Sequence, residues 1–345
     1  MPFGLFFNKR MGWVLPHARC GNTRPQDRRE TAMTTQTARS SALPLPRRNL
    51  GAAATKTLRR PQFWFGLMIL LPILVWYGWF SFGPLLRAFW MATVKYDLMN
   101  PTESPFVGLR NFQQVFSYPL FWISVQRTIT FSVFVYLGTL PLAVFVSLCL
   151  VSVTRGRDFY QFVIFLPVVV SYVAIALLFR MLMDPQTGQF NQILTALGLP
   201  TSLWITGPNS ALPAIAMIDV WKGLGFHVVI ITAGLLGIPE EMYDAAKVDG
   251  AGSWHRFRYV TFPLLGNTLL LESVIMVAGT LQAFTNGQVM GCAGNSCFWI
   301  SLLVYTEAFT NMRFGFATAS AFVLFIFILG LTIIQIRALK PDWQY

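Results

Sequence analysis

Runs of about twenty or more apolar residues recur along this chain of 345 residues, and they restrict its fold more than any other feature. A helix of that length spans the hydrocarbon layer of a bilayer at about 1.5 Å per residue. Backbone groups in lipid must satisfy their own hydrogen bonds, so each run is predicted to be a helix. The sequence therefore predicts an all-α integral membrane protein with six transmembrane helices: residues 63–91, 129–151, 159–183, 211–238, 264–284 and 316–336. The longer connections are expected to be polar loops: residues 93–126, 184–210 and 286–313.

The charge balance agrees with a membrane protein and places the excess of positive charge at one end. Only 12% of the residues are charged, against about a quarter in soluble domains. Twelve of the 26 basic residues lie within residues 1–60, a segment with no apolar period and no signal peptide. We therefore expect a disordered tail there, a six-helix domain over residues 61–345, and no nucleic-acid partner. Met11 and Met33 are alternative start sites, so residues 1–32 need not be translated.

Basic residues also set the expected orientation, because short loops rich in Lys and Arg stay in the cytoplasm. If the N-terminus is cytoplasmic, two compact basic links share its side, one at Arg155 and one within residues 242–265. We therefore expect a multi-pass plasma-membrane protein with both termini in the cytoplasm. Cys292 and Cys297 then face outward, where a disulfide is permitted. Two unrelated thiols are the alternative.

Residues 242–265, MYDAAKVDGAGSWHRFRYVTFPLL, form a polar island between the fourth and fifth apolar runs. Pro239 and the two acids that follow it make a good helix start, and this helix should continue to Val248. Ala245 and Ala246 keep one face small, so another surface can approach closely. The island is therefore predicted to be a docking element without a catalytic group.

The second half of the island predicts a break and a second helix. Residues 249–252 contain two glycines and end the first helix. Ser253 can cap a second helix that runs to about Thr261, with Arg256 and Arg258 in solvent. An ordinary amphipathic loop is the alternative reading.

The island resembles the EAA motif of the membrane subunits of binding-protein-dependent ABC importers. Asp244 stands in place of the usual Glu, and the other matching positions are Ala245, Ala246, Asp249, Gly250, Ala251, Phe257 and Pro263. The Asp-Gly-Ala form and the Thr-x-Pro-Leu ending are similar to the carbohydrate and glycerol-phosphate branch, that of the maltose-type first permease. The resemblance extends to FVGLRNF at residues 106–112 and runs from residue 63 to the C-terminus.

This resemblance implies the fold of a type I ABC importer permease, with a cytoplasmic coupling helix between helices 4 and 5 in a loop at residues 239–263. It implies a second permease subunit, two ATPase subunits, an extracytoplasmic solute-binding protein, surrounding lipid, and a bacterial or archaeal membrane. ATP and magnesium would bind to the ATPase subunits, since this chain has no G-x-x-x-x-G-K-[ST] phosphate loop. The chain itself is expected to bind no cofactor, to catalyse no covalent reaction, and to pass solute by alternating access.

Apart from Arg87 and Arg180 near span ends, three charged residues lie inside predicted spans, where charge is functional by default: Asp219, Lys222 and Glu272. Asp219 and Lys222 are three positions apart and therefore share a helix face. One interpretation is an internal ion pair, joined by Glu272, that fixes helix packing. The other is a polar patch along a solute path.

The segment DVWKGLGF, residues 219–226, is similar to the part of the fourth span that contacts sugar in maltose-type permeases. The resemblance assigns a solute path to Asp219, Lys222, Gly223, Phe226, Met276, Thr280 and Ala283. Sugar sites need hydroxyl partners and an aromatic face. Thr280 and Gln282 would add to the first, and Trp221 or Phe226 would provide the second. Lys222 would also suit an acidic sugar or a phosphate, and the fifth span is less polar than that of the maltose transporter.

Two other functions fit parts of the sequence. An ion-coupled secondary transporter would use Asp219 and Glu272 as proton or sodium sites. Such folds tend to show long internal repeats, and the sequence shows none. A non-transporting membrane scaffold would have no reason to match an ATPase cleft. No Cys and His pattern has zinc spacing, so no metal site is predicted.

Overall fold

The computed structural model describes residues 61–98, 100, 104–292, 294 and 296–339. The chain divides into two units, residues 1–67 and residues 68–345. The predicted tail, residues 1–60, lies outside the described residues. The described residues contain helices, their connections and an isolated bridge between Val94 and Phe106, with no longer strand. The prediction of an all-α protein is therefore confirmed.

Helices long and apolar enough to cross a membrane follow the predicted runs. Among the described residues there are five such stretches: Trp64–Thr93, Pro119–Ser152, Ala211–Leu236, Gly266–Met290 and Phe314–Ala338. The first stretch joins α2 (Pro61–Tyr77), the π-helix η1 (Gly78–Phe82) and α3 (Gly83–Thr93). A sixth span is obtained only if two helices joined at an 87° bend are counted as one. The predicted count of six depends on that pair.

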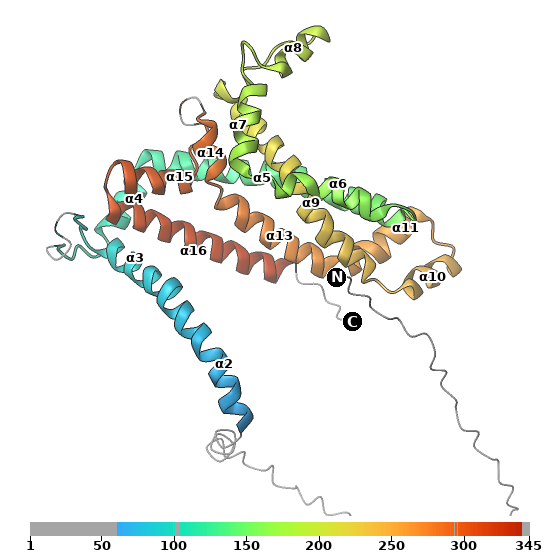
Figure 1. Cartoon of the computed structure of the whole chain (residues 1–345), viewed down its shortest axis with the longest axis horizontal. Coiled ribbons are helices and arrows are strands. Elements are labelled where there is room, and N and C mark those ends of the chain that lie inside the picture. Colours follow the sequence, from blue (N-terminus) through green and yellow to red (C-terminus); the bar gives the residue numbers. More distant parts are fainter. Residues whose placement is uncertain (1–60, 99, 101–103, 293, 295, 340–345) are drawn as a thin grey trace, which may run out of the picture. The chain divides into compact units, whose positions relative to one another are not determined.

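Four long helices form the bundle that holds the site (Figure 1): α5 (Pro119–Ser152), α9 (Ala211–Leu236), α13 (Gly266–Leu281) and α16 (Phe314–Ala338). α9 packs against α5 and α13, and α13 also packs against α5 and α16. α3 and two short helices, α4 (Arg110–Ser117) and α15 (Ile300–Tyr305), pack against α16.

Small residues bring these helices close together, as is common in membrane proteins. A Cβ added at Gly138 of α5 would meet the side chain of Val220 of α9 at 2.9 Å. The hydroxyl of Ser147 donates to the carbonyl of Val228 at 3.1 Å and links the same two helices. Lipid tails are as apolar as Leu, so close packing and such hydrogen bonds hold the bundle together.

The third predicted span is broken, and the expectation of one helix over residues 159–183 is wrong. α6 (Arg157–Val169) and α7 (Tyr172–Leu182) meet at 87°. Val170 and Ser171 have extended backbones between them. Pro167 lies inside α6 near this end, where a proline removes a backbone donor. The short helix α8 (Gln189–Ala196) and the 3₁₀ turn η3 (Trp204–Thr206) follow α7.

Two predicted polar loops hold more helix than expected. α5 begins at Pro119 rather than at residue 129, and within this first part the hydroxyls of Ser124 and Thr128 donate to carbonyls one turn back at 2.8 and 2.7 Å. Residues 286–313 include most of α14 (Thr285–Met290), all of α15 and the π-helix η5 (Thr306–Thr310). Among the described residues of these segments, buried polar side chains are bonded within the protein, so they are compatible with burial.

Candidate functional site

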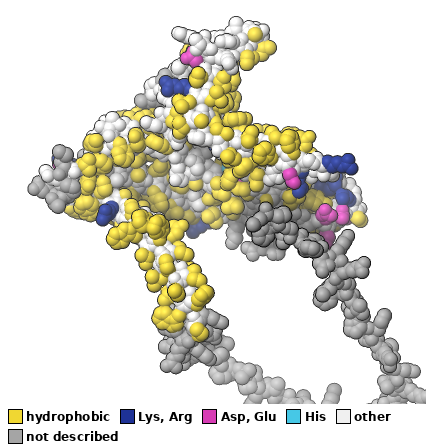
Figure 2. All heavy atoms as spheres, viewed as in Figure 1, with side chains coloured by type: hydrophobic (Ala, Val, Ile, Leu, Met, Phe, Trp, Pro, Cys, Tyr) yellow, Lys and Arg dark blue, Asp and Glu magenta, His cyan; other side chains and the backbone are white. Residues whose placement is uncertain are grey.

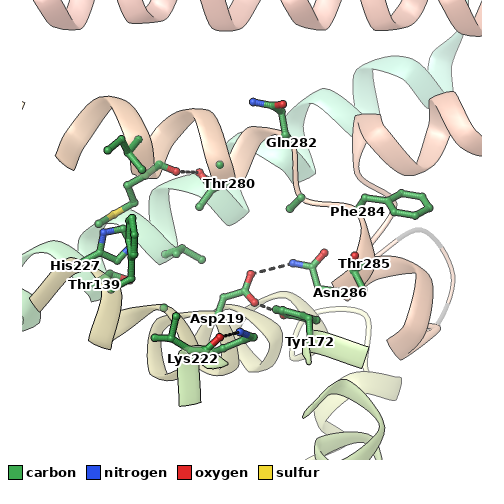
Figure 3. A pocket seen from close by; sticks show the side chains of 18 residues that line it. Thr139, Tyr172, Asp219, Lys222, His227, Thr280, Gln282, Phe284, Thr285 and Asn286 are labelled. Carbon is green, nitrogen blue, oxygen red and sulfur yellow. Dashed lines mark hydrogen bonds between the residues drawn. The ribbon is translucent and has the colours of Figure 1, made fainter. Parts of the chain in front are cut away.

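A cavity of about 490 Å³ lies among α5, α6, α7, α9, α13 and α14 (Figure 3). Seven of the eight predicted solute-path residues line it: Asp219, Lys222, Gly223, Phe226, Met276, Thr280 and Ala283. Gln282 lines it as well. The eighth residue, Trp221, is not part of the lining; its side chain is half exposed and its ring packs 5.6 Å from that of Phe179. Its position on α9 turns it toward α7, and its role in a solute path stays a prediction.

Asp219 is held by neutral donors and not by Lys222. The hydroxyl of Tyr172 donates to Oδ1 of Asp219, and Nδ2 of Asn286 donates to Oδ2 at 2.9 Å. Figure 3 shows the carboxylate between these two side chains. Nζ of Lys222 donates to the carbonyl of Val168 at 3.2 Å. Among the described residues no ion pair joins Asp219 to Lys222, so the first of the two interpretations, an internal ion pair, does not hold.

The shared face of Asp219 and Lys222 instead contacts the two sides of the break in the third span. Val168 is near the end of α6, and Tyr172 is the first residue of α7. A broken helix leaves its last carbonyls without helical partners, and Lys222 bonds to one of them. The break therefore supplies the contacts that an ion pair would otherwise have made.

Asn286 and Trp299 complete the surroundings of Asp219, and sequence reasoning missed both. Oδ1 of Asn286 accepts from Nε1 of Trp299 at 3.0 Å and from the N–H of Gly287 at 2.8 Å. Trp299 is fully buried, and its ring packs 4.6 Å from that of Phe131 on α5. No sequence pattern marked either residue, because an Asn and a Trp in a polar connection are compatible with any loop.

A second buried polar pair lies beside the cavity. Nδ1 of His227 on α9 is 2.5 Å from Oε2 of Glu272 on α13. Glu272 is fully buried, and its other oxygen, Oε1, has no hydrogen-bond partner. The ion-pair interpretation, in which Glu272 joins Asp219 and Lys222, therefore fails here too, since the partner of Glu272 is His227. His227 lines the cavity and lies about two turns after Asp219 on the same helix, which is the pattern that would have found it.

Hydroxyl groups and aromatic faces make up much of the remaining wall. Oγ1 of Thr280 lies 2.6 Å from Oγ of Ser132 and joins α13 to α5. Oγ1 of Thr139 is buried, lines the cavity and has no partner. Phe226 and Phe284 add aromatic faces. A carboxylate, an ammonium group, hydroxyls and aromatic rings are suited to hold a polyhydroxylated molecule of modest size.

The polar island lies between α9 and α13, away from the cavity lining. Its first helix is α10 (Glu240–Val248), with Pro239 at the N-cap and two acids in the first turn. Gly250 has φ +75°, and the N–H groups of Gly250 and Ala251 donate to the carbonyls of Lys247 and Ala246 at 3.0 and 2.9 Å. This is the Schellman arrangement, which ends a helix in a left-handed residue.

The second helix of the island begins at α11 (Ser253–Arg256) and continues through the π-helix η4 (Phe257–Thr261) into α12 (Phe262–Leu264). Gly252 occupies the N-cap position and Ser253 makes no capping bond, so the predicted cap is wrong by one residue. Arg256 is only partly exposed, with Nε buried and unpaired, because it lines an apolar cavity of about 1070 Å³ beside the C-terminal half of α5. The prediction of a solvated Arg256 is therefore wrong, whereas Arg258 is exposed.

The outer surface of the island is both charged and apolar. Figure 2 shows acidic and basic side chains gathered at the end of the bundle where α10 and α11 lie. Asp244 and Lys247 form an exposed ion pair at 2.8 Å. Val248, Trp254 and Tyr259 are among the most exposed large side chains of the described residues. A short helix with exposed apolar side chains and exposed charge is suited to bind another protein.

The two cysteines predicted to face outward form a disulfide in the structure. Cys292 and Cys297 are joined with their Cα atoms 5.7 Å apart. The bond closes a segment between α14 and α15, the same segment that separates Asn286 from Trp299. Within the described ranges, no group of three or more His, Cys, Asp or Glu side chains could hold a metal ion.

Comparison with known proteins gives consistent matches over most of the chain. Residues 139–340 match the family model described as "Binding-protein-dependent transport system inner membrane component". The trehalose/maltose transport system permease protein MalF of Thermococcus litoralis is 32% identical, over 82% of this chain and 96% of that protein. The sn-glycerol-3-phosphate transport system permease protein UgpA of Agrobacterium fabrum is 28% identical, over 77% and 91%.

A solved structure shares the fold. A chain of a bacterial ABC transporter involved in the import of the acidic polysaccharide alginate superposes with a TM-score of 0.73. The two chains are 23% identical, and the match covers 86% of this chain and 99% of that one.

Proposed function

Since this chain belongs to the family of binding-protein-dependent transport system inner membrane components, we propose that it carries a sugar or sugar-like solute through the cavity around Asp219. Membership makes it a membrane-spanning permease subunit of an ABC importer and not an enzyme. The observation that carries the sugar proposal is the wall of the cavity. It combines a fixed carboxylate, an ammonium group, hydroxyls and aromatic faces, the groups that sugar sites use.

The names of relatives support the same class of solute. One relative is named as a permease of a trehalose/maltose transport system, and another as a permease of an sn-glycerol-3-phosphate transport system. The first solutes are neutral and the second is anionic. Lys222 would bind an anionic group, and Asp219 and Thr280 would bind hydroxyls, so the proposal covers neutral and acidic sugars and sugar phosphates.

The polar island would receive the driving force. α10 is exposed, lies between α9 and α13, and matches the EAA motif at positions that include Asp244 and Gly250. In this proposal residues 61–345 form the permease domain, and the loop at residues 239–263 docks into one of two ATPase subunits that bind ATP and magnesium. A second permease completes the pore, and a binding protein delivers the solute from outside. Both termini would then lie in the cytoplasm of a bacterium or archaeon.

Co-purification tests the assembly. Affinity capture of this chain from membranes is expected to bring down an ATPase, a second permease and a binding protein. Capture of the chain without any ATPase would refute the proposed coupling. Ligand screening of the captured binding protein against a panel of neutral sugars, uronic acids and sugar phosphates would then identify the solute.

Uptake by the purified complex in proteoliposomes tests the cavity. Asp219→Ala and Lys222→Ala are each expected to raise the KM for the identified solute about tenfold or more, since a hydrogen bond to a charged group contributes about 1.5–3 kcal/mol. Asp184→Asn, in the loop after α7 and outside the cavity lining, is the matched control and should transport normally. An unchanged KM in both cavity variants would assign Asp219 and Lys222 to helix packing alone.

A further inference from the structure

We propose that Trp299 and Asn286 are positioning residues for Asp219, and that the Cys292–Cys297 disulfide keeps them in place. The charge that Asp219 presents to the cavity would then depend on a segment that lies mostly outside the cavity. The role of this charge in transport rests on the proposed function of the cavity as the solute path. The positioning itself rests on the contacts around Asn286.

The amide of Asn286 can be bonded in only one orientation. Its Oδ1 faces two donors, the N–H of Gly287 at 2.8 Å and Nε1–H of Trp299 at 3.0 Å. Its Nδ2 faces Oδ2 of Asp219 at 2.9 Å. If the amide were flipped, its oxygen would face a carboxylate and its NH₂ group would face two donors, so all three bonds would be lost. Trp299, which can only donate, therefore helps to fix the NH₂ group toward Asp219.

Trp299 is itself held by close packing. It is fully buried against Phe131, and the next backbone N–H, that of Ile300, donates to the hydroxyl of Thr128 on α5 at 3.0 Å. Gly287 lies so close that an added Cβ would be 2.7 Å from Nε1 of Trp299 and 2.7 Å from the carbonyl oxygen of Cys297. The indole thus sits against both α5 and the first turn of α14.

The disulfide restricts the segment that joins these two residues. Both cysteines lie between Asn286 and Trp299, and the N–H of Trp299 donates to the carbonyl of Cys297 at 3.1 Å. Cys297 is buried in the same apolar cluster as Trp299, so one end of the bridge is anchored in the protein. A cross-link across a short loop removes conformations in which its ends move apart. Without the disulfide, the hydrogen bond from the Trp299 indole to the Asn286 amide would be formed for a smaller fraction of the time.

The electrostatic field inside the cavity tests this proposal without knowledge of the solute. Gly279 lines the cavity, and a Cβ added there has no atom within 4 Å, so Gly279→Cys provides a reporter thiol. Cys20 and Cys149 are replaced by Ser, and the complex is purified with its partner subunits. The thiol is then labelled with two methanethiosulfonate reagents, one carrying a trimethylammonium group and one a sulfonate. The ratio of the two rate constants reports the charge that the cavity presents.

Asp219→Asn sets the range of the measurement and is expected to lower the cation-to-anion ratio on the order of tenfold. Trp299→Phe keeps an aromatic ring and removes the indole N–H, and it should move the ratio toward the Asp219→Asn value. Cys292→Ser/Cys297→Ser should move it in the same direction, and the combined variant should move it no further, since both act through one contact. If Trp299→Phe fails to assemble with its partners, Asn286→Ser tests the same bond.

The chain contains a matched control for the indole. Nε1 of Trp204 donates to Oδ1 of Asn191 at 2.8 Å, outside the cavity lining, so Trp204→Phe removes a similar bond and should leave the ratio unchanged. A ratio that stays at the parent value in both the Trp299 and the disulfide variants, while Asp219→Asn shifts it, overturns the proposal. An unchanged ratio in Asp219→Asn overturns it as well. Failure of sugar uptake with the expected ratios would instead refute the proposed function and leave the positioning intact.

Discussion

The buried pair of His227 and Glu272 allows a stability change to be calculated from the structure. Glu272 contacts neither water nor a second hydrogen-bond donor. Its side chain is fully buried, Oε2 bonds to His227 at 2.5 Å, and Oε1 has no partner. His227→Leu would therefore leave a buried carboxyl group without its one partner. Breaking a buried pair in this way costs about 3–5 kcal/mol. For a chain of this size, the loss corresponds to a fall in Tm of about 4–7 °C.

A second substitution should reverse most of this loss. In the His227→Leu background, Glu272→Leu removes the unpaired carboxyl group, and replacement of both members of a buried pair by apolar residues is often neutral or stabilising. The Tm of the double variant should therefore return to within about 3 °C of the parent. Thermal unfolding of the purified complex, followed by intrinsic fluorescence at fixed detergent concentration, measures each change. Lys247→Leu, which removes an exposed ion pair, should change Tm by less than about 1 °C. A double variant less stable than His227→Leu alone would refute the reasoning.

Three further predictions concern the helix contacts and the polar island. Gly250→Val places a β-branched residue at φ +75°, a strain of about 1–2 kcal/mol. ATP-driven uptake should fall, while the amount of protein in membranes, measured by immunoblot, should stay the same. Normal uptake would contradict the coupling role. Asp244→Lys puts a second positive charge beside Lys247 in place of the 2.8 Å ion pair. The amount of ATPase captured with the chain should fall, while the Tm stays unchanged. Full capture would contradict docking at this face. Gly225→Leu would bring a Cβ to 2.8 Å from the backbone of Phe165 and should lower Tm by about 2–4 °C. Gly330→Ala, with open space around it, should not lower Tm. Equal Tm values would contradict close packing of α6 on α9.

The apolar runs predicted most of the fold because lipid leaves few choices to a chain of that composition. The same physical argument could not predict the break in the third span. Pro167 precedes that break, but α5 contains Pro141 and α2 contains Pro72 without a comparable interruption. A proline weakens a helix at many positions, and the neighbouring elements decide whether it bends sharply. Here α9 supplies Lys222 to the carbonyl that the break leaves free.

The site was predicted in part for a related reason. Spacing along one helix placed Asp219 and Lys222 on a common face, and the structure places both in the cavity lining. Spacing carries no information on which groups lie opposite that face. Tyr172 and Asn286 are 47 and 67 residues from Asp219 in the chain, and they meet it only because of the break in the third span and the turn before α14. The ion pair, one of the two interpretations of that spacing, was therefore ruled out by contacts that only the tertiary structure brings together.

The unbroken course of α9 gives the protein a mechanical property. One end of this helix follows directly into the polar island, and Asp219 lies about 26 Å from Leu236 at a rise of about 1.5 Å per residue. A rod of that length acts as a lever: a tilt of about 5° about its Leu236 end moves the carboxylate by about 2 Å. That displacement is comparable to the reach of a hydrogen bond, so a small rotation at the island would be enough to break or remake the contacts of Asp219 with Tyr172 and Asn286. Because α9 is stiff, a movement of the polar island can thus change the hydrogen bonds of Asp219 within the cavity.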